Sequence, residues 1–386
     1  MTILNKYVFH KYVGVILKSK FRFIMPIVLW GVAKLYGCIW VYSKFTLIPQ
    51  EHAASLFGTP WTKLYGESIG PTWVFLFVGW DTQWYITLAS GLSFVSTFFP
   101  GYPLVIRSFA EIVNNYWIVA IMISIILGFI SLPLFQAIAE EYMTHGEALG
   151  STIMMSFFPY IFLFTTVAYS ESLFLVSILA SWYLYLRNRL IASSLCNIFV
   201  ILTKTYGILI VLPMLLDLAI RRKWKQIPII LAPVFLITTI IIPFVHKDIL
   251  NRLILELNTA TWSVSRENLG NYWFRDFIVP IFTSKNPMIY FHYFHAYALA
   301  FIVLIGYLAI RTVKMDWRLG LYSSIMFLII MIFGYTNGII RYASFIFPIW
   351  LGTKIKNPAI IVPVVILFFI HSLVLWYQFL WGQYPM

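Results

Sequence analysis

Long apolar runs recur along the chain. They lie at about 23 to 42, 116 to 138, 149 to 168, 172 to 186, 190 to 202, 206 to 220, 227 to 245, 289 to 310, 319 to 335, 340 to 352 and 358 to 380. Runs of this kind are typical of helices that cross roughly 30 Å of hydrocarbon. The pattern therefore predicts an all-α polytopic membrane protein with about eleven transmembrane helices, forming a single integral-membrane domain over residues 1–386.

Basic residues gather in the short connections between these runs. The clusters are Lys6 to Arg22, Arg187 with Arg189, Arg221 to Lys225, Arg311 to Arg318, and Lys354 with Lys356. All fall on one side if the spans alternate, which places the N-terminus in the cytoplasm by the positive-inside rule. The stretch 190 to 220 then has to be a short helical hairpin, with residues 203 to 207 at its outer tip.

Two outer loops are large, at residues 43–115 and 246–288. The first includes an amphipathic stretch at 73 to 90, where apolar residues recur every three or four positions: Trp73, Phe77, Trp80, Trp84 and Leu88. This spacing predicts an interfacial helix with its apolar face in the lipid. Asp81 stands at the edge of that face, where a carboxylate is costly and marks a functional candidate.

Polar islands recur at the outer ends of other spans. They are Phe99 to Arg107, Tyr169 to Ser172 with Glu171, Lys204 at the hairpin tip, and Arg341 with Tyr342. We expect all of them at the membrane level of Asp81. Cations gathered there would hold a lipid phosphate leaving group, and the carboxylate would accept the proton of an attacking hydroxyl.

Composition excludes several classes of protein. Of the 386 residues 61% are hydrophobic and 11% charged, and mean hydropathy is +0.85, which excludes a soluble globular domain. The net charge of +13 reflects the cytoplasmic clusters, whereas outer acids and bases nearly balance, so we expect no nucleic-acid partner. Without an Asp-x-Asp cluster the sequence requires no divalent metal, and metal dependence stays open.

The islands also carry a family resemblance. Trp80-Asp81 with Trp84-Tyr85, Phe99 to Arg107, Tyr169 to Ser172, Leu202 to Gly207, and Arg341-Tyr342 with Phe347-Pro348 occur in this order over roughly residues 75 to 350. The combination resembles the PIG-V family of GT-C glycosyltransferases. The hairpin tip departs from the family pattern, because Lys204-Thr-Tyr replaces an arginine-proline motif.

The resemblance implies an inverting mannosyltransferase with a GT-C-like fold that uses polyprenyl (dolichyl) phosphate mannose. Asp81 would be the catalytic base. Trp80, Trp84 and Tyr85 would stack on sugar, Arg107, Lys204 and Arg341 would compensate the phosphate charge, and Glu171 and Tyr342 would complete the substrate site. The acceptor would be a lipid-linked sugar or glycolipid, reached at the lumenal face of the endoplasmic reticulum or the outer face of a plasma membrane.

Other interpretations stay open. Asp81 could cap the interfacial helix or pair with Arg107, Glu171 could serve the helix dipole alone, and Arg107 and Arg341 could be interfacial anchors. A secondary transporter or lipid flippase would place its site at the bilayer midplane between two structural repeats, and the sequence has no evident repeat. A non-catalytic subunit of a membrane complex, or an enzyme with a small membrane subunit as partner, is also compatible with the sequence.

Overall fold

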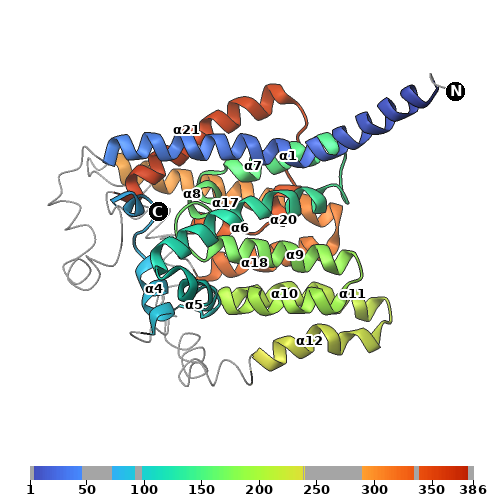
Figure 1. The fold of residues 1–386 in the computed structure, drawn as a ribbon. Coiled ribbons are helices and arrows are strands. Elements are labelled where there is room, and N and C mark those ends of the chain that lie inside the picture. Colours follow the sequence, from blue (N-terminus) through green and yellow to red (C-terminus); the bar gives the residue numbers. More distant parts are fainter. Residues whose placement is uncertain are drawn as a thin grey trace.

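In the computed structural model every regular element of the described residues, 4–45, 72–91, 98–237, 239, 289–333 and 339–380, is a helix. The helices lie side by side in a bundle, with α1 (Leu4–Phe45) along one side and α12 (Ile227–Leu236) along the opposite side (Figure 1). The predicted loop at 246–288 and residues 46–71 of the first loop lie outside the described residues.

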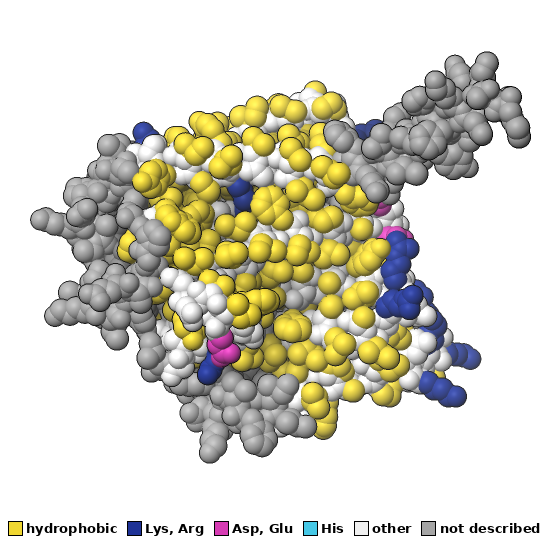
Figure 2. Space-filling model, viewed as in Figure 1, with side chains coloured by type: hydrophobic (Ala, Val, Ile, Leu, Met, Phe, Trp, Pro, Cys, Tyr) yellow, Lys and Arg dark blue, Asp and Glu magenta, His cyan; other side chains and the backbone are white. Residues whose placement is uncertain are grey.

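In the part of the chain that the structure describes, three helices are long and apolar enough to cross a membrane. They are Phe23–Lys44 within α1, α6 (Tyr116–Ala139) and α21 (Pro358–Leu380). Hydrophobic side chains cover the face between the two ends of the bundle, and Lys and Arg gather at one end (Figure 2). The expectation of a helical membrane protein is met at this level, whereas the number of spans, their orientation and the domain assignment stay predictions.

The remaining elements are one further long helix, α17, of 27 residues, and several shorter ones. They are η1 (Thr72–Leu76), α4 (Thr82–Ser90), α5 (Gly101–Val113), α7 (His145–Phe157), α8 (Pro159–Phe164), α9 (Glu171–Leu186), α10 (Leu190–Thr203), η2 (Thr205–Ile210), α11 (Val211–Ile220), η3 (Trp224–Gln226), α17 (Ile289–Met315), α18 (Trp317–Phe333), α19 (Ile339–Ser344) and α20 (Pro348–Leu351).

Two predicted spans are broken helices instead. The run at 149 to 168 divides into α7 and α8 because Phe158 leaves the helical conformation. Pro159 then starts α8, a position where its missing N–H costs nothing. The run at 340 to 352 divides into α19 and α20, and a helix as short as α19 spans only about 9 Å. Both predictions of a continuous span were therefore wrong.

The predicted amphipathic helix at 73 to 90 is also interrupted. A 3-10 turn, η1, comes first, and α4 starts only at Thr82. Trp80 between them has φ 48°, a left-handed conformation that is uncommon for a bulky residue. Phe77 is buried against Trp376, with ring centroids 5.8 Å apart, rather than in the lipid. The interruption places Asp81 at the start of α4.

The chain reverses at the predicted hairpin tip. Helix α10 ends at Thr203, Lys204 is extended, and η2 packs back against α10. A Cβ on Gly207 would come within 2.7 Å of the Val200 carbonyl oxygen, so a side chain there would force the two segments apart. The close return leaves Lys204 at the end of both segments.

An ionic network joins helices at the end of the bundle opposite Lys204. Arg318 pairs with Asp316 at 2.6 Å and with Asp217 at 3.3 Å, and Tyr185 donates to Asp217 at 2.6 Å. These contacts hold α9, α11 and α18 together where their basic clusters begin. Arg318, Asp316 and Asp217 thus form a group of charged residues that is separate from the one that includes Lys204.

Candidate functional site

Asp81 is held in place through its backbone. Its N–H donates to the Tyr169 hydroxyl at 3.1 Å. The Thr82 hydroxyl donates to the Ala168 carbonyl at 3.1 Å, and the Ala168 N–H donates to the Phe77 carbonyl at 2.8 Å. The segment before α9 therefore fixes both sides of the turn that carries Asp81, and its carboxylate is left available for other partners.

Glu171 and Lys204 form a buried ion pair. Glu171 is the first residue of α9, where the helix dipole favours a carboxylate, and Lys204 follows the last residue of α10. Their Oε1 and Nζ atoms are 3.0 Å apart. Such a pair is costly to break from one side only, because the remaining charge stays buried.

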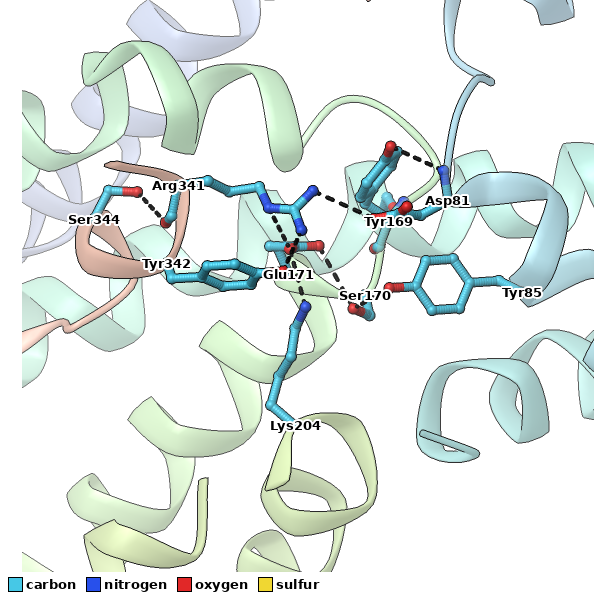
Figure 3. Close-up of polar contacts among 10 residues, drawn as sticks. Asp81, Tyr85, Tyr169, Ser170, Glu171, Lys204, Arg341, Tyr342 and Ser344 are labelled. Atoms are coloured by element: carbon cyan, nitrogen blue, oxygen red, sulfur yellow. Dashed lines mark hydrogen bonds and ion pairs between the residues drawn. The ribbon is translucent and has the colours of Figure 1, made fainter. Parts of the chain in front are cut away.

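Arg341, on α19, lies between the two carboxylates (Figure 3). Its NH1 atom is 3.4 Å from Asp81 Oδ2 and its Nε atom 3.5 Å from Glu171 Oε1. Its NH2 group donates to the Tyr342 hydroxyl at 2.7 Å. The planar guanidinium presents separate donors to separate acceptors, which a lysine ammonium cannot do in the same geometry.

Aromatic rings enclose the two cations. The Arg341 guanidinium carbon lies 5.0 Å from the Phe164 ring centroid, 5.6 Å from that of Tyr169 and 4.7 Å from that of Tyr342. The Lys204 ammonium is 5.5 Å from the Tyr342 ring centroid. Rings at this range attract cations and exclude water, so charges inside interact more strongly than at an exposed surface.

Exposure separates the roles of the two carboxylates. The Asp81 side chain is 23% exposed, whereas those of Glu171 and Arg341 are 2% and 3% exposed. Burial raises the pKa of the Asp81 carboxyl, and the nearby Arg341 guanidinium opposes that rise. Asp81 is therefore the more accessible of the two carboxylates, and Glu171 is the buried counter-ion of the two cations. Direct substrate contact by Glu171 stays a prediction.

The four charged residues Asp81, Glu171, Lys204 and Arg341 form one cluster. Tyr85 lines this cluster, and Trp80 and Trp84 lie farther out. The Tyr85 hydroxyl is 2.9 Å from the Ser170 hydroxyl, and its ring is buried edge-on to that of Tyr169, with centroids 6.2 Å apart. Trp80 and Trp84 are exposed, and Trp84 stacks near Phe98. Sugar stacking by these rings stays a prediction.

Arg107 is not brought into the cluster. It is exposed on α5 and pairs with Glu111 at 3.6 Å, one turn along the same helix. Two of its neighbours have structural contacts instead. A Cβ on Gly101 would lie 2.7 Å from the Leu202 carbonyl oxygen, so α5 starts directly against the end of α10 that precedes Lys204. The Tyr102 hydroxyl donates to the Ala120 carbonyl at 2.8 Å.

Sequence reasoning missed one supporting residue. Ser124, inside apolar α6, donates to the Tyr169 carbonyl at 3.0 Å and lies 2.8 Å from the Tyr102 hydroxyl. The bond to Tyr169 steadies the segment that holds Asp81, and the bond to Tyr102 joins α6 to α5. A buried hydroxyl in a spanning helix needs a partner, and that need is the signal that could have drawn attention to it.

Within the described ranges, no three His, Cys, Asp or Glu residues are grouped as metal ligands would be. Comparison of the chain with known protein families, with curated protein sequences and with solved structures found no match. The case for a function therefore rests on the cluster itself: a partly exposed carboxylate, a buried counter-ion and two cations at one end of a helical membrane protein.

Proposed function

We propose that the protein is a glycosyltransferase that moves mannose from a polyprenyl phosphate donor to a lipid-linked or glycolipid acceptor. The observation that carries the proposal is the contact between Asp81 and Arg341, 3.4 Å apart. It joins a reachable carboxylate to a buried cation, and the reaction needs both: one to accept a proton and one to compensate a phosphate.

The proposed reaction balances with these groups alone. An acceptor hydroxyl oxygen forms a bond to the anomeric carbon, and the bond from that carbon to the phosphate oxygen breaks. The hydroxyl proton passes to Asp81, and polyprenyl phosphate leaves with the electron pair. Attack from the face opposite the phosphate inverts the anomeric centre.

Charge balance predicts how the donor enters. Two carboxylates, Asp81 and Glu171, neutralise two cations, Lys204 and Arg341. A phosphodiester brings a further negative charge, so it competes with Asp81 for Arg341. The contact of Asp81 with Arg341 is longer than the contact of Glu171 with Lys204, 3.4 Å against 3.0 Å. Asp81 is also the more exposed of the two carboxylates. We therefore infer that donor phosphate displaces Asp81 from Arg341 and frees it to act as a base.

The proposed fold and location follow the same reasoning. The protein would be GT-C-like with about eleven spans, its N-terminus in the cytoplasm and the Asp81 cluster on the outer or lumenal face. The gathering of Lys and Arg at one end (Figure 2) supports this orientation through the positive-inside rule. Membrane lipids and the two lipid substrates would be its partners.

The test is transfer of labelled sugar by the purified protein. Polyprenyl phosphate mannose and polyprenyl phosphate glucose are each supplied with lipid extract, for wild type, Asp81→Asn and Glu111→Gln. We expect mannose transfer by wild type and Glu111→Gln, and a loss of about 10² to 10⁴ in rate for Asp81→Asn. Transfer of glucose but not of mannose would overturn mannose as the donor sugar. Transfer from neither donor would overturn the glycosyltransferase function.

A second candidate is a secondary transporter. The observation in its favour is the pair of broken helices, α7 with α8 and α19 with α20, the first of which ends and the second of which begins near the cluster. Interrupted helices of this kind form the substrate sites of many transporters. Uptake of labelled substrate into vesicles that contain the protein, without any covalent product, would favour this function over transfer.

A further inference from the structure

A lysine lies inside the first spanning helix. Lys34 is near the middle of the apolar segment Phe23–Lys44, and only 5% of it is exposed. A charged residue at such a position is costly and is retained for a role. Its neighbours on α1 are apolar, so its partners have to come from another part of the chain.

Among the described residues, the hydrogen-bond acceptors of Lys34 lie at one place, the end of α8. The ammonium donates to the Phe162 carbonyl at 3.0 Å, to the Thr165 hydroxyl at 3.4 Å and, in a short contact, to the Thr166 hydroxyl. It also lies 3.8 Å from the Trp30 ring centroid. In the part of the chain that the structure describes, no carboxylate pairs with it. A cation is stabilised here because the last carbonyls of a helix carry partial negative charge.

Helix α8 needs such support. It has 6 residues, too few for a helix to be stable alone, and Phe158 separates it from α7. Thr165 and Thr166 bond back to the Ile161 and Phe162 carbonyls, which closes the end of the helix. Lys34 ties this end to α1 from outside.

The residues that follow α8 hold the cluster. Ala168 bonds to Phe77 before Asp81 and to Thr82 after it, and the Tyr169 hydroxyl accepts from the Asp81 N–H. The rings of Phe164 and Tyr169 enclose the Arg341 guanidinium. Segment 159–171, defined here as the site segment, therefore connects Lys34 to both the carboxylate and the cation.

We propose that Lys34 is a positioning residue: by fixing the end of α8 it holds the site segment, and with it Asp81 and Arg341, in the geometry the reaction needs. The role in catalysis rests on the proposed glycosyltransferase function. The hold on the site segment does not, and the experiment separates the two.

Amide hydrogen exchange is measured on the purified full-length protein for wild type, Lys34→Met, Lys34→Arg and Lys44→Met. Methionine has similar length without charge or donors, and the two threonines keep their own bonds, so we expect Lys34→Met to fold. Bonds to a charged group are lost, so we expect about tenfold faster exchange confined to the site segment. Lys34→Arg keeps charge and donors and should restore slow exchange, and Lys44→Met should resemble wild type.

Unchanged exchange in the site segment of Lys34→Met would overturn the proposal. An equal increase in exchange across α6 and α9 would also overturn it, because that would indicate general loosening of the fold. So would failure of Lys34→Arg to restore slow exchange in the site segment. In the transfer assay Lys34→Met should lower kcat about tenfold. Donor KM should rise as well, because the site segment also holds Arg341, and a rise in KM with kcat unchanged would contradict the positioning of the base. If wild type transfers no sugar, the glycosyltransferase function fails while the exchange result still decides what Lys34 holds.

Discussion

Arg341 bridges Asp81 and Glu171, with nitrogen to oxygen distances of 3.4 Å and 3.5 Å. One guanidinium thus contacts a partly exposed carboxylate and a buried one. Because the three groups share one set of contacts, a change at any of them alters the charge seen by the others.

Arg341→Lys should keep the charge and lose the shared geometry. An ammonium cannot reach both carboxylates and the Tyr342 hydroxyl in the way that the guanidinium does. We expect a folded protein whose kcat/KM for transfer falls at least about tenfold. Arg107→Lys is the matched control, since Arg107 is exposed and pairs with Glu111. An equal fall in kcat/KM for Arg107→Lys would indicate that Arg107 also takes part in the site.

Transfer should fail on the acid side of its pH profile. Burial raises the pKa of the Asp81 carboxyl above the ordinary value for an aspartate, and a general base works only when deprotonated. As pH falls through the raised pKa, Asp81 gains a proton and the rate is lost. A profile of kcat/KM against pH should therefore decline at a pH above about 4, the ordinary range of an aspartate. Constant activity down to that range would contradict the assignment.

Glu171→Gln should destabilise the protein in a way that an anion repairs. The substitution leaves Lys204 and Arg341 with too little negative charge nearby. Removing one partner from a buried pair costs about 3 to 5 kcal/mol, which thermal unfolding would detect. A short-chain polyprenyl phosphate added in detergent should raise the Tm of Glu171→Gln more than that of Glu111→Gln. An equal rise in both would argue against a phosphate site at the two cations.

Gly101→Ala should disturb the packing of α5 against the end of α10 that precedes Lys204. The new Cβ would lie 2.7 Å from the Leu202 carbonyl oxygen, closer than real contacts allow, so α5 and α10 would have to separate. We expect a loss of about 1 to 3 kcal/mol in unfolding free energy together with lower transfer. Gly146→Ala is the control, because its Cβ would meet only Lys356 Cβ at 3.8 Å. Equal stability in both variants would show that the contact is tolerated.

The sequence indicated much of the candidate site. Glu171, Lys204 and Arg341 are charged residues at the ends of apolar runs, and a charge that cannot enter the lipid has to find partners at the same membrane level. The structure places all three in contact with one another or with Asp81. Arg107 follows the same pattern, but its side of α5 faces outward, and the sequence does not reveal which way a short helix turns.

The helix breaks were harder to anticipate. Apolar residues continue through Phe158 and through 345 to 347, so hydropathy alone joins α7 to α8 and α19 to α20. Buried backbone at such a break needs hydrogen bonds from elsewhere, and these are tertiary contacts. Trp30 supplies one of them from a distant helix by donating to the Ser156 carbonyl at 2.9 Å, which no local pattern reveals.

The central claim, that Asp81 is a base released from Arg341 by donor phosphate, is tested most directly by binding. The affinity of wild type and Asp81→Asn for a short-chain polyprenyl phosphate is measured in detergent beside their rates of mannose transfer. The account predicts that Asp81→Asn loses transfer yet binds the phosphate about tenfold more tightly, or ~1.4 kcal/mol, because a competing carboxylate has gone. Weaker binding by Asp81→Asn, or transfer at the wild-type rate, would contradict it.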